Sequence, residues 1–389
     1  MIRASINTFF SVAVLMAFSF FSFSQETDIE ISVLTCTPGE EIYSMYGHSG
    51  IRVSGLVAGQ KIDNVYNYGT FEFDDGFTWK FVQGKLNYML SRQEFDKFQY
   101  EYFYFNRGIR EQILNLSDER KDLVFRALEE NYKPENRYYL YDFFYDNCAT
   151  RIRDVLQKSL GDSLVFVPPE HIDMTYREMI DMYHEPFPWT DFGIDVALGL
   201  PCDRKLGEQG DMFIPDYLYD QLGRATLDGR PLVSKDIEVL PREIYPVSKP
   251  VFKPNLIIWI ICGSCIVFGL LGLKRPKLFN AMARTVLFLY GLIGVFLLFL
   301  WIGTDHTATA DNMNLLWAFP IHLVLAFASW KKNWQHSYFK FGFLLSLVLI
   351  VSWYMIPQQL HSAILPLLIL FAFISGRIGL SPIEEGASL

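Results

Sequence analysis

Two residues in the first half of the sequence could form a thiol nucleophile and its base. Cys148 follows Asp146 and Asn147, both common helix N-cap residues, and opens the amphipathic segment 148–160. A thiolate in the first turn of a helix is stabilised by the helix dipole and by free N–H groups. The sequence therefore predicts that Cys148 is poised as a nucleophile.

A cysteine nucleophile needs a base and a group that orients the base. His48 is the leading candidate base, because it opens the predicted strand 48–53 and its ring can project from the strand end. Asn67, on the next predicted strand, 63–68, is our candidate for the orienting group. Each residue also has a structural interpretation, since helix-start cysteines are often buried hydrophobes and lone strand histidines are usually structural.

The cysteine count leaves the pairing of the thiols open. Cys36, Cys148 and Cys202 lie in the first half, and an odd number in an oxidising compartment leaves at least one thiol free. A Cys36–Cys202 disulfide would leave Cys148 reactive, whereas a disulfide to Cys148 itself would remove it. Because the histidines of this half show no HExxH or CxxC spacing, we expect neither a metal site nor a cofactor.

The sequence divides near residue 254 into a polar half and an apolar half. Hydrophobic residues make up 51% of the chain, and the mean hydropathy is +0.16, values that suit a two-part membrane protein. Arg3 and the apolar run 9–23 predict a secretory signal, 1–24, with an uncleaved anchor helix as the alternative. Either way, the domain 25–254 is exported. The net charge of −9 argues against a nucleic-acid partner.

The exported domain has the pattern of an α+β fold. Alternating apolar residues predict strands at 30–36, 48–53 and 63–68. Helical periodicity predicts helices at 92–105, 117–131, 148–160 and 168–183.

The apolar half, 255–378, contains about five candidate transmembrane helices. They are 256–273, 285–303, 315–330, 341–356 and 363–375, of which the third and fifth are short for a span. Lysine and arginine occur in alternate loops, so the positive-inside rule makes 304–314 and 357–362 outer loops. The tail 379–389 is then cytoplasmic, and we expect a multi-pass membrane protein with its N-terminal domain outside; the family resemblance described below implies the bacterial inner membrane.

The outer loop 304–314 is more polar than a short connection requires. It carries Asp305, His306, Asn312 and Asn314 on the same side of the membrane as the exported domain. We expect these residues to bind a headgroup or an amine, or to seat the exported domain.

Five segments resemble a known family. They are YSMYGHSGIRV (43–53), VYNYGTFEF (65–73), YDNCATRIRD (145–154), DMFIPDYL (211–218) and TDHTATADNMNLLWAFP (304–320). The order of an early strand histidine, a polar residue on the next strand and Asn-Cys opening a helix resembles permuted papain-like (NlpC/P60-like) enzymes, including the lecithin:retinol acyltransferase group. The whole set looks like the Lnb-type lipoprotein N-acyltransferases of Bacteroidota.

The resemblance implies an acyltransferase that acts through a cysteine thioester, with Cys148 as nucleophile and His48 as base. Asn67 as the third member is our own placement, and we expect the neighbours Tyr46, Ser49 and Asn147 to contribute to substrate binding. The implied partners are diacylated lipoproteins and membrane phospholipid. Alternatives are a membrane-tethered cysteine peptidase or amidase acting on cell-wall peptide, and a non-enzymatic envelope assembly factor. A transporter is disfavoured, because the predicted spans hold few titratable groups besides His322.

Overall fold

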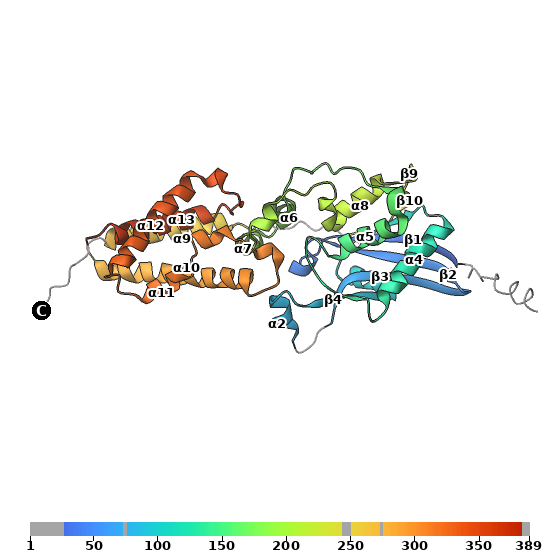
Figure 1. The fold of residues 1–389 in the computed structure, drawn as a ribbon, viewed down its shortest axis with the longest axis horizontal. Helices are drawn as coiled ribbons and strands as arrows, with labels where there is room; N and C mark the ends of the chain where they lie inside the picture. Colours follow the sequence, from blue (N-terminus) through green and yellow to red (C-terminus); the bar gives the residue numbers. More distant parts are fainter. Residues whose placement is uncertain (1–26, 73–75, 243–249, 273–274, 383–389) are drawn as a thin grey trace, which may run out of the picture.

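The chain has two parts arranged along its long axis, a sheet domain and a helical bundle (Figure 1). The structure is a computed structural model that describes residues 27–72, 76–242, 250–272 and 275–382. The predicted signal peptide and most of the predicted C-terminal tail lie outside these residues.

The sheet domain is built on seven antiparallel strands in the order β10-β5-β1-β2-β3-β4-β6. All three predicted strands are confirmed, and each is longer than expected. The strands are β1 Thr27–Cys36, β2 His48–Val57, β3 Gln60–Phe71, β4 Asn87–Glu94, β5 Ile109–Leu114, β6 Tyr138–Leu140 and β10 Val233–Leu240. A small second sheet contains β7 Leu164–Val165, β8 Thr226–Leu227 and β9 Arg230–Pro231.

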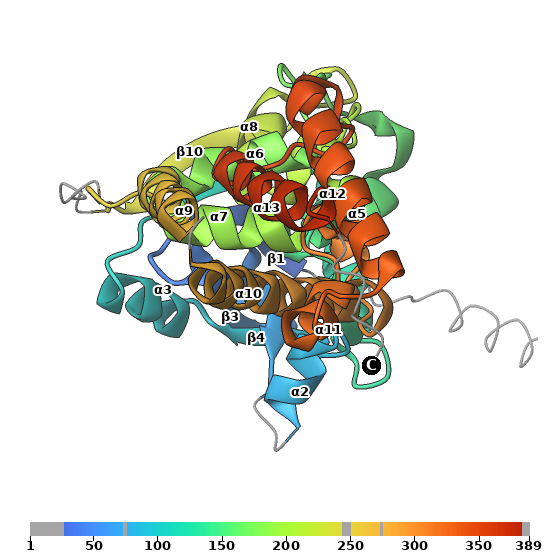
Figure 2. The same ribbon diagram turned by 90° about the vertical axis from the view of Figure 1, so that its left-hand side faces the viewer.

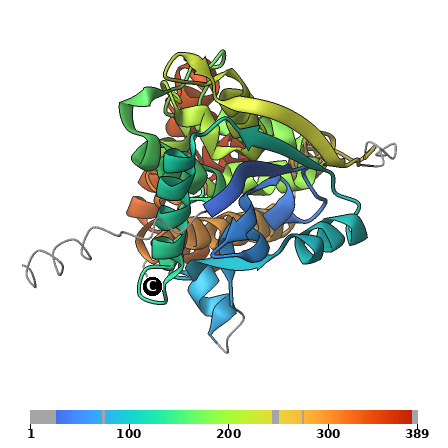
Figure 3. The same ribbon diagram turned by 90° about the vertical axis from the view of Figure 1, so that its right-hand side faces the viewer.

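Helices cover both faces of the large sheet. Because side chains alternate along β1, Ile31 and Val33 join one apolar cluster and Leu34 joins another. The first cluster includes apolar residues of α4 (Asp118–Tyr132), α5 (Cys148–Leu160) and α8 (Pro215–Arg224), and the second includes those of α3 (Phe95–Tyr104). Figure 3 shows α4 and α3 on opposite sides of the strands. The remaining helices of this part are α2 Phe77–Val82, α6 Tyr176–His184, α7 Pro188–Ala197, η1 Ile42–Ser44, η2 Gly161–Ser163, η3 Leu200–Asp203 and η4 Gly210–Phe213.

Two helix predictions need their starts corrected. The helix predicted at 92–105 begins at Phe95, because residues 92–94 pair with β3 as the end of β4. The helix predicted at 168–183 begins at Tyr176, where Thr175 and Glu178 form a capping box. The helix predicted at 148–160 is confirmed with the same bounds.

Among the described residues, the helical part contains three helices long and apolar enough to cross a membrane. These are α9 Pro254–Leu271, α10 Pro276–Ile302 and α12 Asn333–Val351, and the 16-residue α13 Ile364–Gly379 is apolar but shorter. The third predicted span, 315–330, is wrong as a continuous helix. Its regular part is only α11, Ile321–Phe327, preceded by the 3-10 turn η7 Met313–Leu316.

The break before α11 follows from Pro320 and from close packing. Proline disfavours helical backbone at the residue before it and lacks an N–H for the helix. Here the chain also runs directly against α10: a Cβ on Gly294 would lie 1.8 Å from the carbonyl oxygen of Ala318. Small residues allow such backbone contact in membrane bundles.

The sheet domain meets the bundle through α7. Its last turn leaves carbonyl groups without helical partners, and side chains from both predicted outer loops donate to them. Asn312 Nδ2 lies 2.9 and 3.0 Å from the oxygens of Val196 and Ala197, and Gln358 Nε2 lies 3.0 Å from that of Leu198. Figure 2 shows α7 against the end of the bundle, beside α9, α10 and α13.

Replacing Gly199 should loosen this junction. Its N–H donates to the Ala308 oxygen at 2.8 Å, and an added Cβ would lie 1.8 Å from the Ala310 oxygen. We expect Gly199→Ala to cost about 1–3 kcal/mol through overpacking and to lower the thermal unfolding temperature of the full chain in detergent.

Gly193→Ala is the matched control. Gly193 is exposed within α7 and a Cβ there meets nothing within 4 Å. Its unfolding temperature should stay the same or rise, since alanine favours helix over glycine by up to about 1 kcal/mol. Equal unfolding temperatures for the two variants would contradict the close contact at Gly199.

Candidate active site

Cys148 is the first residue of α5, and Asn147 fixes the helix start. Asn147 Oδ1 accepts hydrogen bonds from the N–H groups of Ala149 and Thr150, and the Thr150 hydroxyl accepts one from the Asn147 N–H. The amide nitrogen Nδ2 donates to the oxygens of Phe143 and Phe213. The Asn147 amide is thus used within the protein, so it positions Cys148 and leaves no donor for the predicted substrate contact.

The structure brings His48 and Asn67 together beside Cys148. His48 is the first residue of β2, and its Nε2 is hydrogen-bonded to Asn67 Oδ1 on β3. The second ring nitrogen is then available to the thiol, and a side-chain hydrogen bond joins His48 and Cys148. The β3–β4 register shifts between Asn67 and Thr70, and Gly69 within this irregularity has a φ of +83° that glycine adopts without strain.

The environment favours a thiolate–imidazolium pair. Burial acts to raise the pKa of Cys148, but the His48 charge, a His48 hydrogen bond and the N–H groups of Ser49 and Ala149 outweigh it and lower that pKa. Burial likewise acts to lower the pKa of His48. The charge of Cys148, together with the hydrogen bonds that His48 donates to Cys148 and to Asn67 Oδ1, raises it above its usual value.

Aromatic side chains surround the thiol. A Cβ on Gly69 would lie 3.7 Å from Cys148 Cβ and 3.7 Å from the Tyr141 ring, so these groups are neighbours. Tyr141 stacks on Tyr88 with ring centroids 4.4 Å apart, and Tyr88 meets Phe71 at 5.4 Å. These three rings come from the end of β3, from β4 and from the residue that follows β6.

The other cysteines are not disulfide partners of Cys148. All five cysteines lie among the described residues, and all are free. Burial raises the pKa of Cys36 to about 12 and that of Cys202 to about 12. The thiol of Cys148 is therefore the one of the three in the sheet domain that is favoured to ionise.

Ser49 and Tyr46 flank His48 but face different surroundings. The N–H of Ser49 points to the Cys148 sulfur, and its buried hydroxyl has no hydrogen-bond partner among the described residues. The Tyr46 hydroxyl is instead hydrogen-bonded to His184 Nε2 at 2.5 Å, and its ring packs on Phe143 and Tyr183. Tyr46 thus belongs to the neighbouring α6 region.

The polar residues of the loop 304–314 contact the sheet domain. Asn314 Nδ2 lies 3.2 Å from the Val196 oxygen, and Asn312 donates to the same turn of α7. His306 Nε2 lies 3.2 Å from the Val82 oxygen, at the end of α2. Asp305 is exposed, and its N–H donates to the Gln83 oxygen. These contacts fit the predicted seating role; the predicted headgroup or amine contacts of this loop stay a prediction.

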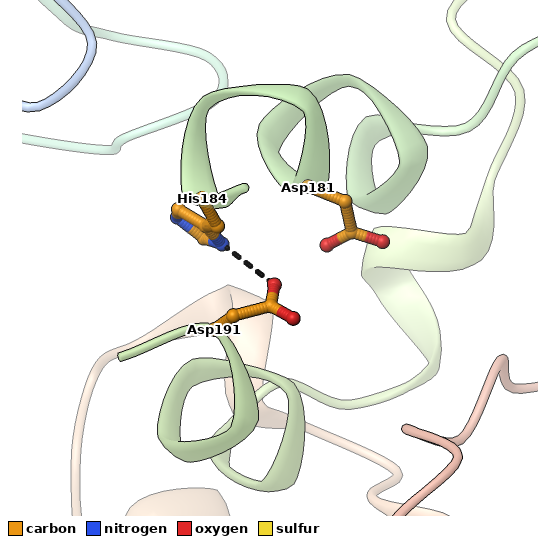
Figure 4. Close-up of side chains that lie close together, drawn as sticks. All are labelled: Asp181, His184 and Asp191. Carbon is orange, nitrogen blue, oxygen red and sulfur yellow. Dashed lines mark hydrogen bonds and ion pairs between the residues drawn. The ribbon is translucent and has the colours of Figure 1, made fainter. Parts of the chain in front are cut away.

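A second group of titratable side chains lies where α6, α7 and the loop before α13 meet. Asp181, His184 and Asp191 lie close together (Figure 4), and Asp191, Asp195 and His361 form an overlapping group. Burial and the nearby carboxylates of Asp195 and Asp191 raise the pKa of Asp181 to about 8. The sequence analysis expected no metal site because Asp181, His184 and Asp191 match neither HExxH nor CxxC spacing, and the fold alone brings the two helices together.

The fold and the site together define a membrane protein whose exported α+β domain carries a Cys–His–Asn arrangement. Two family models match the chain: residues 21–180 match the Lnb N-terminal periplasmic domain, and residues 247–380 match the Lnb transmembrane domain. The chain belongs to the Lnb family. No curated protein and no solved structure matches it significantly.

The family match confirms the resemblance noted from the sequence and places the N-terminal domain in the periplasm. The transmembrane model is named for five transmembrane helices, whereas the described residues contain three helices of full length and the shorter α13 and α11. The segment 181–246 lies between the two matches, yet its α8 and η4 pack against α5 in the sheet domain.

Alkylation by iodoacetamide should reveal the lowered pKa of Cys148. His48 lowers the pKa of Cys148, whereas burial raises the pKa of Cys36 and of Cys202 to about 12, so Cys148 should label at a lower pH than either of them. In His48→Ala, only the N–H groups of Ser49 and Ala149 oppose the effect of burial on the thiol, so labelling of Cys148 should shift to higher pH. Mass spectrometry of the labelled peptides over a pH series gives both profiles. Identical profiles for Cys148 with and without His48 would contradict the pair.

Proposed function

We propose that this protein is a lipoprotein N-acyltransferase, which moves an acyl chain through a Cys148 thioester to the N-terminal amine of membrane lipoproteins. The observation that carries the proposal is the Cys148–His48–Asn67 arrangement in a domain seated directly on a membrane bundle. Membership of the Lnb family supports it. In this proposal the sheet domain has a papain-like fold. It forms one catalytic domain that ends near residue 254.

The first half-reaction acylates the enzyme. The Cys148 thiolate attacks an ester carbonyl of a membrane lipid, and a C–S bond forms while the carbonyl oxygen becomes an oxyanion. The Ser49 N–H, which points at the sulfur, lies where it can stabilise that oxyanion. The C–O bond to the lipid alcohol then breaks, and His48, as imidazolium, gives its proton to the leaving oxygen.

The second half-reaction transfers the chain. The free α-amine of the diacylated lipoprotein attacks the thioester carbonyl, and neutral His48 takes a proton from the amine nitrogen. The C–S bond breaks, which releases an amide and regenerates the Cys148 thiolate and the His48 imidazolium. Asn67 holds the imidazole through Nε2, so the other nitrogen serves both steps.

The membrane part provides proximity as well as anchoring. The acyl donor lipid and the acceptor lipoprotein are both embedded in the outer face of the bilayer. Holding the Cys148 thiol at that face therefore raises the effective concentration of both substrates near the thiol. The two outer loops both contact the sheet domain, which supports a cytoplasmic C-terminus. A peptidase or amidase could use the same Cys–His pair, but it would gain nothing from several helices when one suffices as an anchor.

Cys148→Ala should abolish N-acylation of lipoproteins. The sulfur forms the thioester, so mass spectrometry of lipoproteins from cells lacking any redundant enzyme should show them one acyl chain lighter. Cys265→Ala, a cysteine change in α9 remote from the site, should leave the complement full. Full N-acylation with Cys148→Ala would exclude this function.

The intact mass of the purified protein separates acyl transfer from peptide cleavage. Incubated with phospholipid, wild-type protein should gain one hydroxylamine-labile acyl group on Cys148. His48→Ala should gain it about 10²–10⁴ times more slowly, the usual contribution of a general acid–base group. Absence of the acyl adduct, together with cleavage of cell-wall peptide, would favour the peptidase or amidase.

A further inference from the structure

The group Asp181, His184 and Asp191 has the composition of a metal site. Asp181 and His184 lie on α6, and Asp191 lies in the first turn of α7, so two helices bring the three side chains face to face (Figure 4). One carboxylate or imidazole atom of each lies within 4.8 Å of those of the other two. These residues are not part of the Cys148 site.

One of the three distances between ligand atoms already suits a small divalent ion. Zinc binds imidazole nitrogen and carboxylate oxygen at about 2.0–2.2 Å, so neighbouring ligand atoms in a tetrahedral site lie about 3.3 Å apart. His184 Nδ1 and Asp191 Oδ1 are 3.2 Å apart. An ordinary hydrogen bond also fits this distance, so further observations are needed.

The buried arginine near the group is already paired with other carboxylates. Arg177 is fully buried, but it is paired with Asp195 at 2.8 Å and with Asp203 at 3.0 Å. Asp181 Oδ1 is buried and has no hydrogen-bond partner among the described residues. A buried carboxyl oxygen without a donor is costly unless the group is protonated or a cation binds, so a metal ion at this atom would satisfy it.

The surrounding residues would orient the three ligands. His184 Nε2 is hydrogen-bonded to the Tyr46 hydroxyl at 2.5 Å, which leaves Nδ1 for the ion. The second oxygen of Asp181 accepts from Gln359 Nε2 at 3.1 Å, and Asp191 Oδ2 lies 3.5 Å from His361 Nε2. Metal-binding histidines and carboxylates are generally held by such outer partners.

We propose that Asp181, His184 and Asp191 bind one divalent transition-metal ion of the Zn²⁺ type, which joins α6 and α7 to the outer loop 357–362. Imidazole together with carboxylate favours zinc over magnesium or calcium, which prefer all-oxygen sites. Because Gln359 and His361 belong to the loop leading into α13, the ion would tie the periplasmic domain to the membrane part. This proposal is independent of the acyl-transfer reaction.

Metal binding is tested on the full-length protein in detergent after treatment with EDTA. Loaded with ZnCl₂ and passed over a desalting column, the wild-type protein should retain one zinc per chain by mass spectrometry of the metal. Saturating zinc should also raise its unfolding temperature by at least about 3 °C, because a ligand that binds only the folded state stabilises it. Equal concentrations of Mg²⁺ should give a smaller shift.

Asp181→Asn is the informative variant, with Asp173→Asn as its control. Without zinc, Asp181→Asn should unfold near the wild-type temperature, since asparagine has the shape of the neutral carboxyl that the raised pKa of Asp181 favours. It should bind zinc at least about tenfold more weakly and lose the zinc-dependent shift. Asp173 is exposed and paired with Lys205, so Asp173→Asn should keep the wild-type zinc affinity and the zinc-dependent shift in unfolding temperature.

Two outcomes would overturn the proposal. One is wild-type protein that retains no zinc after loading and shows no zinc-dependent shift, which would make the group a hydrogen-bonded and protonated network. The other is Asp181→Asn that retains zinc as wild type does, which would place the ion elsewhere. The wild-type measurement alone decides the first outcome, so the test holds even if a variant fails to fold.

Discussion

The Asn147 amide is the contact on which the candidate active site depends. Its oxygen holds two N–H groups of the first turn of α5, and its nitrogen holds the oxygens of Phe143 and Phe213. One buried side chain thus fixes the helix start, the loop before it and the η4 segment from later in the chain. Because Cys148 is the next residue, these four hydrogen bonds set the position of the thiol.

The membrane part is connected to the same loop. Thr307, in the outer loop between α10 and η7, donates to Asp142 Oδ2 at 2.8 Å, and Asp142 Oδ1 accepts from the N–H groups of Phe144 and Tyr145. These residues lie immediately before Asn147. The seating of the domain on the bundle and the placement of the nucleophile therefore share one short segment.

Polar side chains of the outer loops donate hydrogen bonds to carbonyl oxygens at the end of α7, for a physical reason. The C-terminal turn of α7 would leave acceptors unsatisfied at a buried interface, and Asn312, Asn314 and Gln358 satisfy them. A junction made of directed hydrogen bonds fixes orientation more strictly than apolar contact does. The proposed acyl transfer between two membrane-anchored substrates would benefit from such a fixed orientation, since the thiol would have to face the bilayer surface.

Local sequence patterns were enough for several features of this protein. Alternating apolar residues identified β1, β2 and β3, and an amphipathic period with its N-cap residues identified α5 with its observed bounds. Cys148 and His48 could be paired from residue chemistry and segment order, and Asn67 from its place on the next strand. Long apolar runs marked α9, α10 and α12, because length and hydropathy are properties of a segment alone.

Tertiary structure decided what depends on contacts between distant segments. Two contacts join residues 66 or more positions apart. Asn147, the cap of α5, donates to the Phe213 oxygen, and Asp191 lies beside His361. The interruption before α11 was marked by Pro320, but the backbone contact with Gly294 could be seen only in the packed bundle. Sequence by itself determined the two-part layout and the candidate pair Cys148 and His48, since these arise from local period and residue type. The tertiary structure decided which polar groups are satisfied and by what, because hydrogen-bond partners are set by packing in space and not by order along the chain.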